Sequence, residues 1–411
     1  MRLCAVIVCF SAAAPAQQTY TWEQLKDKFQ KNNPALRAGQ DNVAESKAQE
    51  ITAFLRPNPD FSASFDQINP FPTSPYRPLA SLLPLFSTSY LHERQNKREL
   101  RLDSARKNTS IAASQQEDTL RTMLFTLRNA FVMALQANAI RDVARENLAN
   151  YDKVLSVGRD RLQAGDIAQV DMMRLDLQRV QYESDLQTAE VNVRTAKIQL
   201  LQLLNDRTPV EQFDITGNFD FSEVLTPLSE LRQLAFDARP DLRAALQTVE
   251  KAKADHQLAV ANGSIDPTFS VDVGRQPPVP VYIGASISIP LRIFDRNQGE
   301  KERTEIEIRR SERLREAAAA QVYSDVDSAF ATLNSNVTLL RSYKTKYLDE
   351  STKVRDTIAF SYQHGGASLL DFLNAESEYR TTRLSYLNLV GSYLNAANQL
   401  NLAVGREVIT Q

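Results

Sequence analysis

The chain has 411 residues, of which 43% are hydrophobic and 24% charged, and its 48 basic and 50 acidic side chains leave a formal net charge of −2. A chain of this length would suit two or three ordinary globular domains. The near balance of charge argues against a nucleic-acid-binding protein, which usually has a basic surplus. It also gives no reason to expect a strongly acidic or basic ligand.

The first residues, 1–16, have the pattern of a secretory signal peptide. Arg2 precedes an apolar run, and small residues ending in Ala-Pro-Ala follow it. The alternative is a buried terminal strand or helix. Both cysteines, Cys4 and Cys9, lie in this segment, so we expect a mature chain without disulfides or thiolate metal sites. No later run of about 18 apolar residues predicts a spanning helix, so a secreted product would be soluble or would cross an outer membrane by strands.

Prolines divide the rest of the chain into two similar halves. They gather between residues 57 and 84 and again between 267 and 290. Each group is followed by a proline-free tract, 85–208 in the first half and 291–411 in the second. This outline suggests an internal duplication.

Three pairs of segments match between the halves in the same order. They are "NPALRAGQ" with "RPDLRAAL", "NPDFSASFD" with "DPTFSVDVG", and "RLQAGDIAQVDMMRLDLQ" with "SYQHGGASLLDFLNAESE". Chance is a poor explanation for three matches at nearly constant spacing. We therefore predict a first structural repeat over 17–208, a linker over 209–227 and a second repeat over 228–411.

Each half is predicted to have the same elements in the same order. These are a first helix (about 21–55 and 228–261), two strands (about 59–87 and 267–290), a very long helix (about 91–162 and 296–362), and a return helix (about 168–205 and 368–404). Thr21 and Gln24 have the spacing of a capping box for the first of them. A helix as long as the third element would span ~100 Å, which predicts an elongated, coiled-coil-like body.

The predicted strands alternate apolar and polar residues. Phe61, Ala63 and Phe65 alternate with Ser and Asp, and "YIGASISI" has the same period. The strand at about 79–87 is less regular and contains Pro84. Such alternation is typical of outer-membrane strands and also of a small sheet packed on helices; the signal peptide and the Ser, Gly and Asp faces favour the membrane. Four strands cannot close into a barrel, so several chains would have to share one.

Glycines mark the turn between each long helix and its return helix. Gly165 and the pair Gly365–Gly366 interrupt sequences that otherwise predict helix, and glycine accepts the left-handed backbone of a helix end. Ser368 is placed to cap the second return helix. A phosphate-binding loop is the alternative, but no strand precedes the glycine pair and no Lys-Ser/Thr follows it.

This plan resembles the TolC-like outer-membrane efflux proteins over nearly the whole mature chain. The resemblance rests on the duplicated order of elements, on the tips "AGDIAQVD" and "HGGASLLD", and on "IPLRIFDRNQGE" after the last strand. That last stretch is most similar to the subgroup that works with heavy-metal efflux pumps.

The resemblance implies a mainly α-helical homotrimer with a small membrane β part. Duplicated helix hairpins would form a periplasmic α-barrel, and four strands per chain would contribute to a shared 12-stranded outer-membrane β-barrel in contact with lipid. The chain would be the exit duct of a tripartite efflux system, with a periplasmic adaptor (membrane fusion) protein and an inner-membrane pump, RND type favoured. No catalytic site, cofactor, metal or nucleic acid is expected of such a conduit.

The resemblance also assigns roles to the tips. Adaptor docking would fall to Gly165, Asp166, Ile167, Ala168, Gly365, Gly366, Ala367 and Ser368. The periplasmic gate would use Asp171, Tyr362, Asp371 and Asn374. Ala367 stands where TolC has an arginine in its closing network, so that network cannot form in the same way. TolC also has two aspartates around its constriction; Asp371 matches the first, and Asn374 replaces the second. A ring of Asp371 carboxylates could still attract cations; the alternative is a solvated residue at a helix end.

The sequence gives less support to three other functions. His92, His256 and His364 lie far apart in sequence, and no catalytic set of Ser, His and Asp is apparent, which disfavours an enzyme. The exit duct of a type I secretion system stays open within the channel class. A non-channel periplasmic coiled-coil scaffold would share the helices and the repeat, but it would not need the alternating strands.

Overall fold

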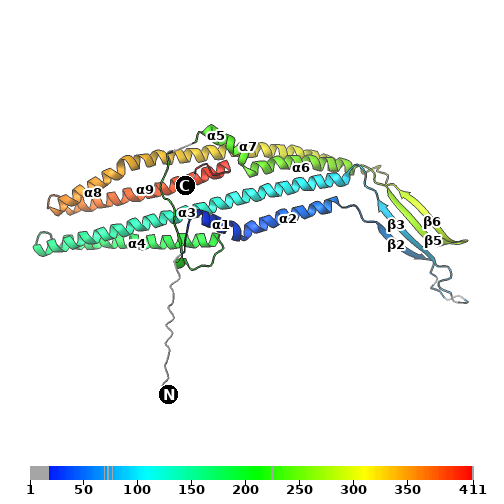
Figure 1. The fold of residues 1–411 in the computed structure, drawn as a ribbon, viewed down its shortest axis with the longest axis horizontal. Helices are drawn as coiled ribbons and strands as arrows, with labels where there is room; N and C mark the ends of the chain where they lie inside the picture. The colour runs from blue at the N-terminus through cyan, green and yellow to red at the C-terminus, as the bar shows by residue number, and fades with distance from the viewer. Residues whose placement is uncertain (1–17, 69, 72–73, 76, 224–225, 410–411) are drawn as a thin grey trace, which may run out of the picture. The chain divides into compact units, whose positions relative to one another are not determined.

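The computed structural model describes residues 18–68, 70–71, 74–75, 77–223 and 226–409 (Figure 1). The predicted signal peptide lies outside these residues. The chain divides into two compact units. Unit 1 comprises Met1–Arg37, Asp118–Arg239 and Gln321–Gln411, and unit 2 comprises Ala38–Glu117 and Pro240–Ala320. Each unit therefore takes segments from both halves of the sequence.

Long helices make up most of the described chain. The first half has α1 (Trp22–Asn32), α2 (Pro34–Phe54), α3 (Lys97–Ala164) and α4 (Gln169–Leu203). The second half has α5 (Leu228–Ala238), α6 (Pro240–Asn262), α7 (Gln298–Ser342), the π-helical stretch η2 (Tyr343–Tyr347), α8 (Leu348–Gln363) and α9 (Leu369–Val404). Among the described residues, no helix combines the length and the apolar character needed to cross a bilayer.

The first helix of each half is broken in two, so the continuous helices predicted at about 21–55 and 228–261 were wrong. The breaks lie at Asn33 (φ −71°, ψ 119°) and Arg239 (φ −71°, ψ 120°), each directly before a proline. A proline ring disfavours the helical conformation of the preceding residue, while proline itself suits the first position of the next helix. Asn33 Oδ1 then accepts hydrogen bonds from the backbone N–H of Ala35 (2.9 Å) and Leu36 (3.2 Å), which caps α2.

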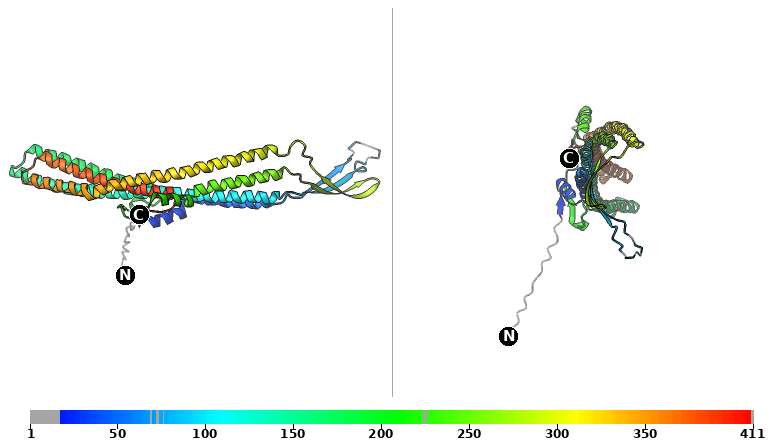
Figure 2. Two further views of the ribbon diagram at one scale, coloured as in Figure 1. Left: turned by 90° about the horizontal axis from the view of Figure 1, so that it is seen from above. Right: turned by 90° about the vertical axis from the view of Figure 1, so that its right-hand side faces the viewer.

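The helix pairs of unit 1 are antiparallel hairpins (Figure 1 and Figure 2). In each of them, the later part of a long helix packs beside its return helix: α3 beside α4, and α8 beside α9. A core inside this unit joins α1 to α3 and α4, with Leu25, Phe29, Leu127, Leu200 and Leu204 fully buried. These contacts fix the base of the first hairpin.

A small parallel sheet in unit 1 was not predicted. β1 (Gln18–Tyr20) pairs with β4 (Phe213–Ile215), and Phe213 packs into the core next to it. Strands of three residues carry no periodic pattern, so the sequence alone did not reveal them. The adjacent backbone N–H of Thr21 donates to Gln24 Oε1 (3.0 Å), as the predicted capping box requires.

An ion pair lies at the edge of the same core, and it makes the folding stability of unit 1 depend on pH. Lys28 Nζ of α1 lies 2.5 Å from Asp206 Oδ2, just beyond α4. Burial alone would raise the pKa of Asp206. The hydrogen bonds from Lys28 and Thr208 together outweigh this effect, so the pKa lies below its ordinary value. The pKa of Asp206 is therefore lower in the folded than in the unfolded protein. The stability that the ion pair contributes is fully present above the unfolded-state pKa, and it is lost as the pH falls through the folded-state pKa.

We expect Asp206→Asn to lower the free energy of unfolding at pH 7 by on the order of 1–2 kcal/mol. The neutral amide cannot be protonated, so the difference from the wild-type protein should shrink below pH ~4. Thermal unfolding of both proteins between pH 7 and pH 3 measures this. A difference that stays constant over the whole range would contradict the ion pair's role.

Candidate functional site

A four-stranded antiparallel sheet lies in unit 2. Its strands are β2 (Asp60–Asp66), β3 (Leu83–Leu91), β5 (Thr268–Gln276) and β6 (Val279–Ser288), in the order β2-β3-β5-β6. The second strand was predicted at about 79–87, which is wrong at both ends. Successive turns, closed by Ala80 N–H to Arg77 O and Leu82 N–H to Leu79 O, occupy the chain before Leu83.

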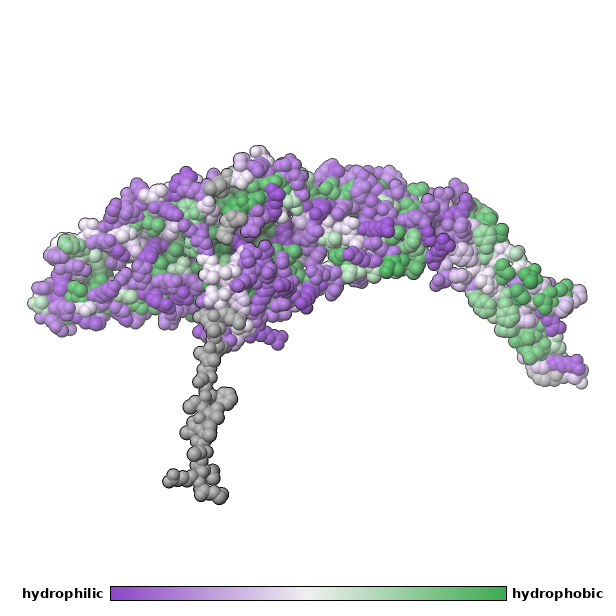
Figure 3. Space-filling view, in the orientation of Figure 1, coloured by the Kyte–Doolittle hydropathy of each residue, from purple (hydrophilic) through white to green (hydrophobic). Residues whose placement is uncertain are grey.

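The register gives this sheet one apolar face. Pairs on that face include Phe86 with Val273 and Val273 with Ile283, both far along their strands from the helices. The face is formed by Phe61, Ala63, Phe65, Phe86, Thr88, Tyr90, Phe269, Val271, Val273, Ile283, Ala285 and Ile287. It is exposed in the single chain: Ile283 is 78% and Val271 53% accessible. Figure 3 shows apolar surface gathered over this sheet.

The opposite face is mostly polar. Its paired positions are Ser62 with Ser87, Ser270 with Ser286, and Asp272 with Gly284, while Leu83, Leu85 and Leu91 of β3 are the exceptions. Within the described residues, β2 and β6 are the outer strands, each paired on one side. An exposed apolar face of this size and two unpaired strand edges are typical of a surface that contacts lipid or another protein chain.

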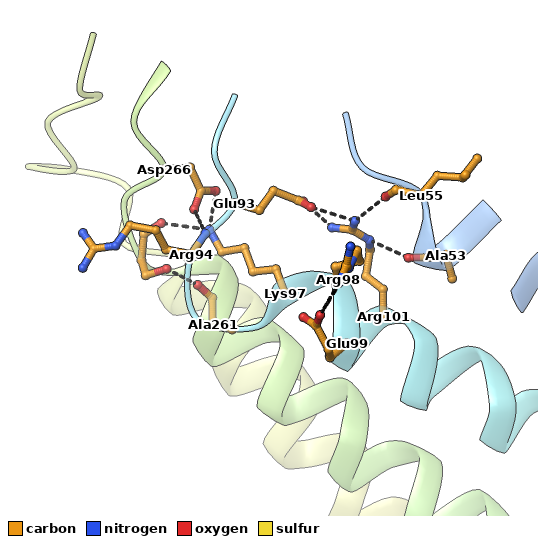
Figure 4. Close-up of polar contacts among 11 residues, drawn as sticks. Ala53, Leu55, Glu93, Arg94, Lys97, Arg98, Glu99, Arg101, Ala261 and Asp266 are labelled. Carbon is orange, nitrogen blue, oxygen red and sulfur yellow. Dashed lines mark hydrogen bonds and ion pairs between the residues drawn. The ribbon is translucent and has the colours of Figure 1, made fainter. Parts of the chain in front are cut away.

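Ion pairs join the sheet to the helices of unit 2 (Figure 4). Lys97, at the start of α3, is almost fully buried, and its Nζ lies 2.5 Å from Asp266 Oδ2 and 3.1 Å from Ser264 O. The backbone N–H of Arg94 donates to Asp266 Oδ1 (2.9 Å). Burial raises the pKa of Asp266, but the hydrogen bonds from Lys97 and Arg94 outweigh it and hold the pKa below its usual range.

A second contact at this junction fixes the end of α2. The Arg101 guanidinium of α3 donates to the carbonyl oxygens of Ala53 (3.3 Å) and Leu55 (3.2 Å), and it also binds both carboxylate oxygens of Glu93 (Figure 4). Cations suit the last carbonyls of a helix. The segment that leads from α2 into β2 is thereby held against α3.

The predicted tip residues lie at the two hairpin turns of unit 1. Gly165 (φ +82°) and Gly365 (φ +77°) have the left-handed backbone that ends a helix. Asp166 N–H donates to Arg161 O (2.9 Å) and Gly366 N–H to Ser361 O (2.8 Å), the same closing bond in both copies. Of the eight residues assigned to docking, Ile167 and Ala367 are half-buried against the core of the tips, and the others are exposed.

Aromatic side chains pack this core. Tyr362 stacks on Phe372 with ring centroids 4.9 Å apart, and Tyr151 stacks on Tyr182 at 4.5 Å. Arg161 Nη1 donates to Tyr362 O (2.9 Å). Sequence reasoning missed Arg161 and both of the other tyrosines; the position of Arg161, four residues before Gly165, was the one available signal.

Two of the residues that the resemblance assigns to the gate, Tyr362 and Asp171, lie in different hairpins. Tyr362 is 8% exposed, and its hydroxyl has no hydrogen-bond partner among the described residues. Burial raises the pKa of Tyr362, and the Arg161 charge lowers it to a smaller extent. Asp171 itself lies 3.8 Å from Arg174.

Asp371 forms hydrogen bonds at the N-terminal end of its own helix, α9. Its Oδ2 accepts from Ser368 Oγ (2.7 Å), and Ser368 Oγ in turn accepts from Asp371 N–H (3.1 Å), which makes a capping box at the start of α9. Asn374 is exposed one turn further on. The structure thus gives Asp371 a capping role, distinct from the role in conduction that the resemblance implies.

Two substitutions separate these roles. Asp371→Ala should cost about 0.5–2 kcal/mol of stability because the box is lost, whereas Asp371→Asn keeps an acceptor and should cost little. If Asp371 also acts on passing ions, both variants should reduce cation over anion permeability in planar bilayers. If only Asp371→Ala changes anything, and only the unfolding midpoint, the residue is a cap and nothing more.

Comparisons with known proteins point to one family. Residues 231–406 match the family model of outer membrane efflux proteins. A relative from Cupriavidus metallidurans, the cobalt-zinc-cadmium resistance protein CzcC, is 26% identical over 259 residues, which cover 60% of this chain and 59% of that protein. The chain is therefore similar to outer membrane efflux proteins over part of its length.

Solved structures share the fold of this chain. CusC, whose crystal structures concern folding and transmembrane channel formation, is 19% identical with a TM-score of 0.79, covering 98% of this chain and 99% of that one. The open state of the Neisseria gonorrhoeae MtrE outer membrane channel is 17% identical with a TM-score of 0.75, covering 98% and 94%. At under 25% identity, these likenesses show that the chain shares the fold of such channels.

Proposed function

We propose that this protein is the exit duct of a tripartite efflux system, a homotrimer that carries substrates from an inner-membrane pump across the periplasm and the outer membrane. The observation that carries the proposal is the sheet of unit 2, with its apolar face exposed and its polar face opposite. Apolar residues on one face and Ser, Gly and Asp on the other suit lipid outside and a wet lumen inside.

The sheet also explains why one chain is not enough. An open edge in a bilayer leaves backbone groups without hydrogen bonds, which costs several kcal/mol per group. Strands β2 and β6 carry these edges, so β6 of one chain is available to pair with β2 of the next. Three copies of a four-stranded sheet make a closed barrel of 12 strands, an even number as in other single-lumen barrels.

The hairpin tips are the proposed contact with the rest of the system. Glycine turns present short exposed loops, including Asp166 and Ser368, above a packed aromatic core. We propose that these loops dock a periplasmic adaptor protein that connects the duct to a pump of the RND type. Tyr362 and Asp171 are the proposed gate residues, and the missing partner of the Tyr362 hydroxyl would come from a neighbouring chain.

Divalent heavy-metal cations are the proposed cargo, on the strength of the likeness to CzcC. Among the described residues, no group of three or more His, Cys, Asp or Glu is arranged to hold a metal. A duct needs weak interactions that let cargo leave, so selection among metals is assigned to the pump.

The test is the native mass, in detergent, of protein extracted from a purified outer-membrane fraction. A trimer that conducts ions in planar bilayers supports the duct. Protein released in soluble form without detergent would overturn it and favour a periplasmic scaffold. Loss of cobalt, zinc or cadmium tolerance on deleting the gene tests the cargo separately.

A further inference from the structure

A cavity of about 300 Å³ lies at the junction between the sheet and the helices of unit 2. Its wall is formed by Arg56, Pro57, Tyr90, His92, Glu93, Gln95, Asn96, Lys97, Arg98 and Glu99. The wall therefore combines the loop after α2 with the segment that leads from β3 into α3. The contacts of Arg101 with Ala53 and Leu55 hold these two segments together.

Cations outnumber carboxylates around this cavity. The wall and its ion-pair partners carry Arg56, Lys97, Arg98 and Arg101 against Glu93, Glu99 and Asp266. Lys97 is neutralised by Asp266, Arg98 by Glu99 and Arg101 by Glu93. Arg56 is exposed and has no ion-pair partner within the described residues, so a positive charge remains available to an anion.

Arg94 lies beside this group of charged residues but outside the cavity wall. Its backbone binds Asp266, while its guanidinium points away from the group without a drawn partner (Figure 4). Arg98 is held in place, because its guanidinium lies 4.3 Å from the centre of the Phe54 ring and 2.7 Å from Glu99. A fixed guanidinium presents donors that match phosphate oxygens.

Two residues of the cavity wall, Tyr90 and His92, adjoin the apolar face of the sheet. Tyr90 pairs with Phe269 on that face, and the His92 ring meets the Phe269 ring edge-on with centroids 6.4 Å apart. Ile287 pairs with Phe269 from the other side. An anion bound at Arg56 and Arg98 would thus have a continuous strip of apolar side chains beside it.

We propose that this cavity binds the phosphate headgroup of an anionic phospholipid whose acyl chain lies along Phe269 and Ile287. The site rests on the proposed function, because it places the junction at the leaflet nearest the helices. Charge complementarity selects an anionic headgroup over a zwitterionic one, and the apolar strip selects a lipid over a free phosphate.

The experiment uses the intact detergent-solubilised trimer, stripped of lipid and titrated in native mass spectrometry. The probes are phosphatidylglycerol, phosphatidylethanolamine with the same acyl chains, and inorganic phosphate as competitor. The variant R56Q/R98Q removes the guanidinium of Arg56 and that of Arg98, which is paired with Glu99. The charge-matched control is R309Q/R313Q, two exposed arginines of α7 outside the cavity wall.

Wild-type protein and the control should bind phosphatidylglycerol about tenfold more tightly than phosphatidylethanolamine, and R56Q/R98Q should lose this preference. Millimolar phosphate should not displace the lipid. Equal binding of the two lipids by wild-type protein, an unchanged preference in the variant, or full displacement by phosphate would each overturn the lipid site. Arg56→Gln alone, which breaks no ion pair of the described chain, gives the same test if the double variant assembles poorly.

Failure of this site and failure of the duct are distinguishable. A trimer recovered from the outer membrane without the lipid preference would overturn the lipid site alone. Absence of the protein from the outer membrane would overturn both.

Discussion

Replacement of Ile283 by arginine should sharply reduce the amount of assembled protein in the outer membrane. Ile283 lies in the middle of β6, pairs with Val273 and is 78% exposed on the apolar face. An arginine facing lipid at the bilayer midplane costs about 2–4 kcal/mol. Each copy of the chain in a shared barrel would bear this cost, so assembly should suffer more than the folding of the helices.

The neighbouring positions provide the controls. Ser286→Arg places the same charge on the polar face, where water is expected, and should be much milder. Ile287→Arg shares the apolar face but lies at the helix-side end of β6, where the cost should fall to about 0–1 kcal/mol. Yields of extracted trimer measure the series. Equal yields for Ile283→Arg and Ser286→Arg would refute a lipid-facing sheet.

Replacement of Asp266 by alanine should destabilise the junction between sheet and helices by about 3–5 kcal/mol. The Lys97 ammonium, with 4% of its side chain accessible, would keep only the Ser264 carbonyl as a partner. The backbone N–H of Arg94 would lose its acceptor as well. A lower unfolding midpoint and faster proteolysis near residue 266 are the expected readouts.

A double-mutant cycle isolates the ion pair from other effects. Lys97→Met removes the charge while filling similar space, and the variant carrying both Lys97→Met and Asp266→Ala leaves no buried charge alone. We expect the double variant to be clearly more stable than the sum of the single effects predicts. Additive losses would show that the two side chains contribute independently, and that the buried pair is not what ties α3 to β5.

The long helices and their tips were predictable because their signals are local. Proline-free tracts rich in helix-forming residues predicted α3, α4 and α9, and isolated glycines predicted the turns at Gly165 and Gly365. The breaks before Pro34 and Pro240 were predictable too, because proline restricts the residue before it. They were missed because the apolar pattern continues across both prolines.

Other features depend on partners distant in sequence. The register of β3 is set by β2 and β5, so its irregular alternation could not fix its ends. Arg161 reaches the carbonyl of Tyr362 across 201 residues of chain, which no local pattern encodes. The ion pair of Lys97 with Asp266 likewise appears only once β5 is placed beside the start of α3.

The two tips differ in a way that bears on their motion. Return helix α9 begins with the Ser368–Asp371 capping box, whereas α4 begins at Ala168, which offers no side-chain cap. Such a cap is worth about 1 kcal/mol, so the first turn of α4 should fray about fivefold more often than that of α9. Amide hydrogen exchange should therefore be faster after Gly165 than after Gly365. In a closed ring of three chains, tips without a side-chain cap and tips with one would alternate around the axis. Opening would begin at the three tips without a cap.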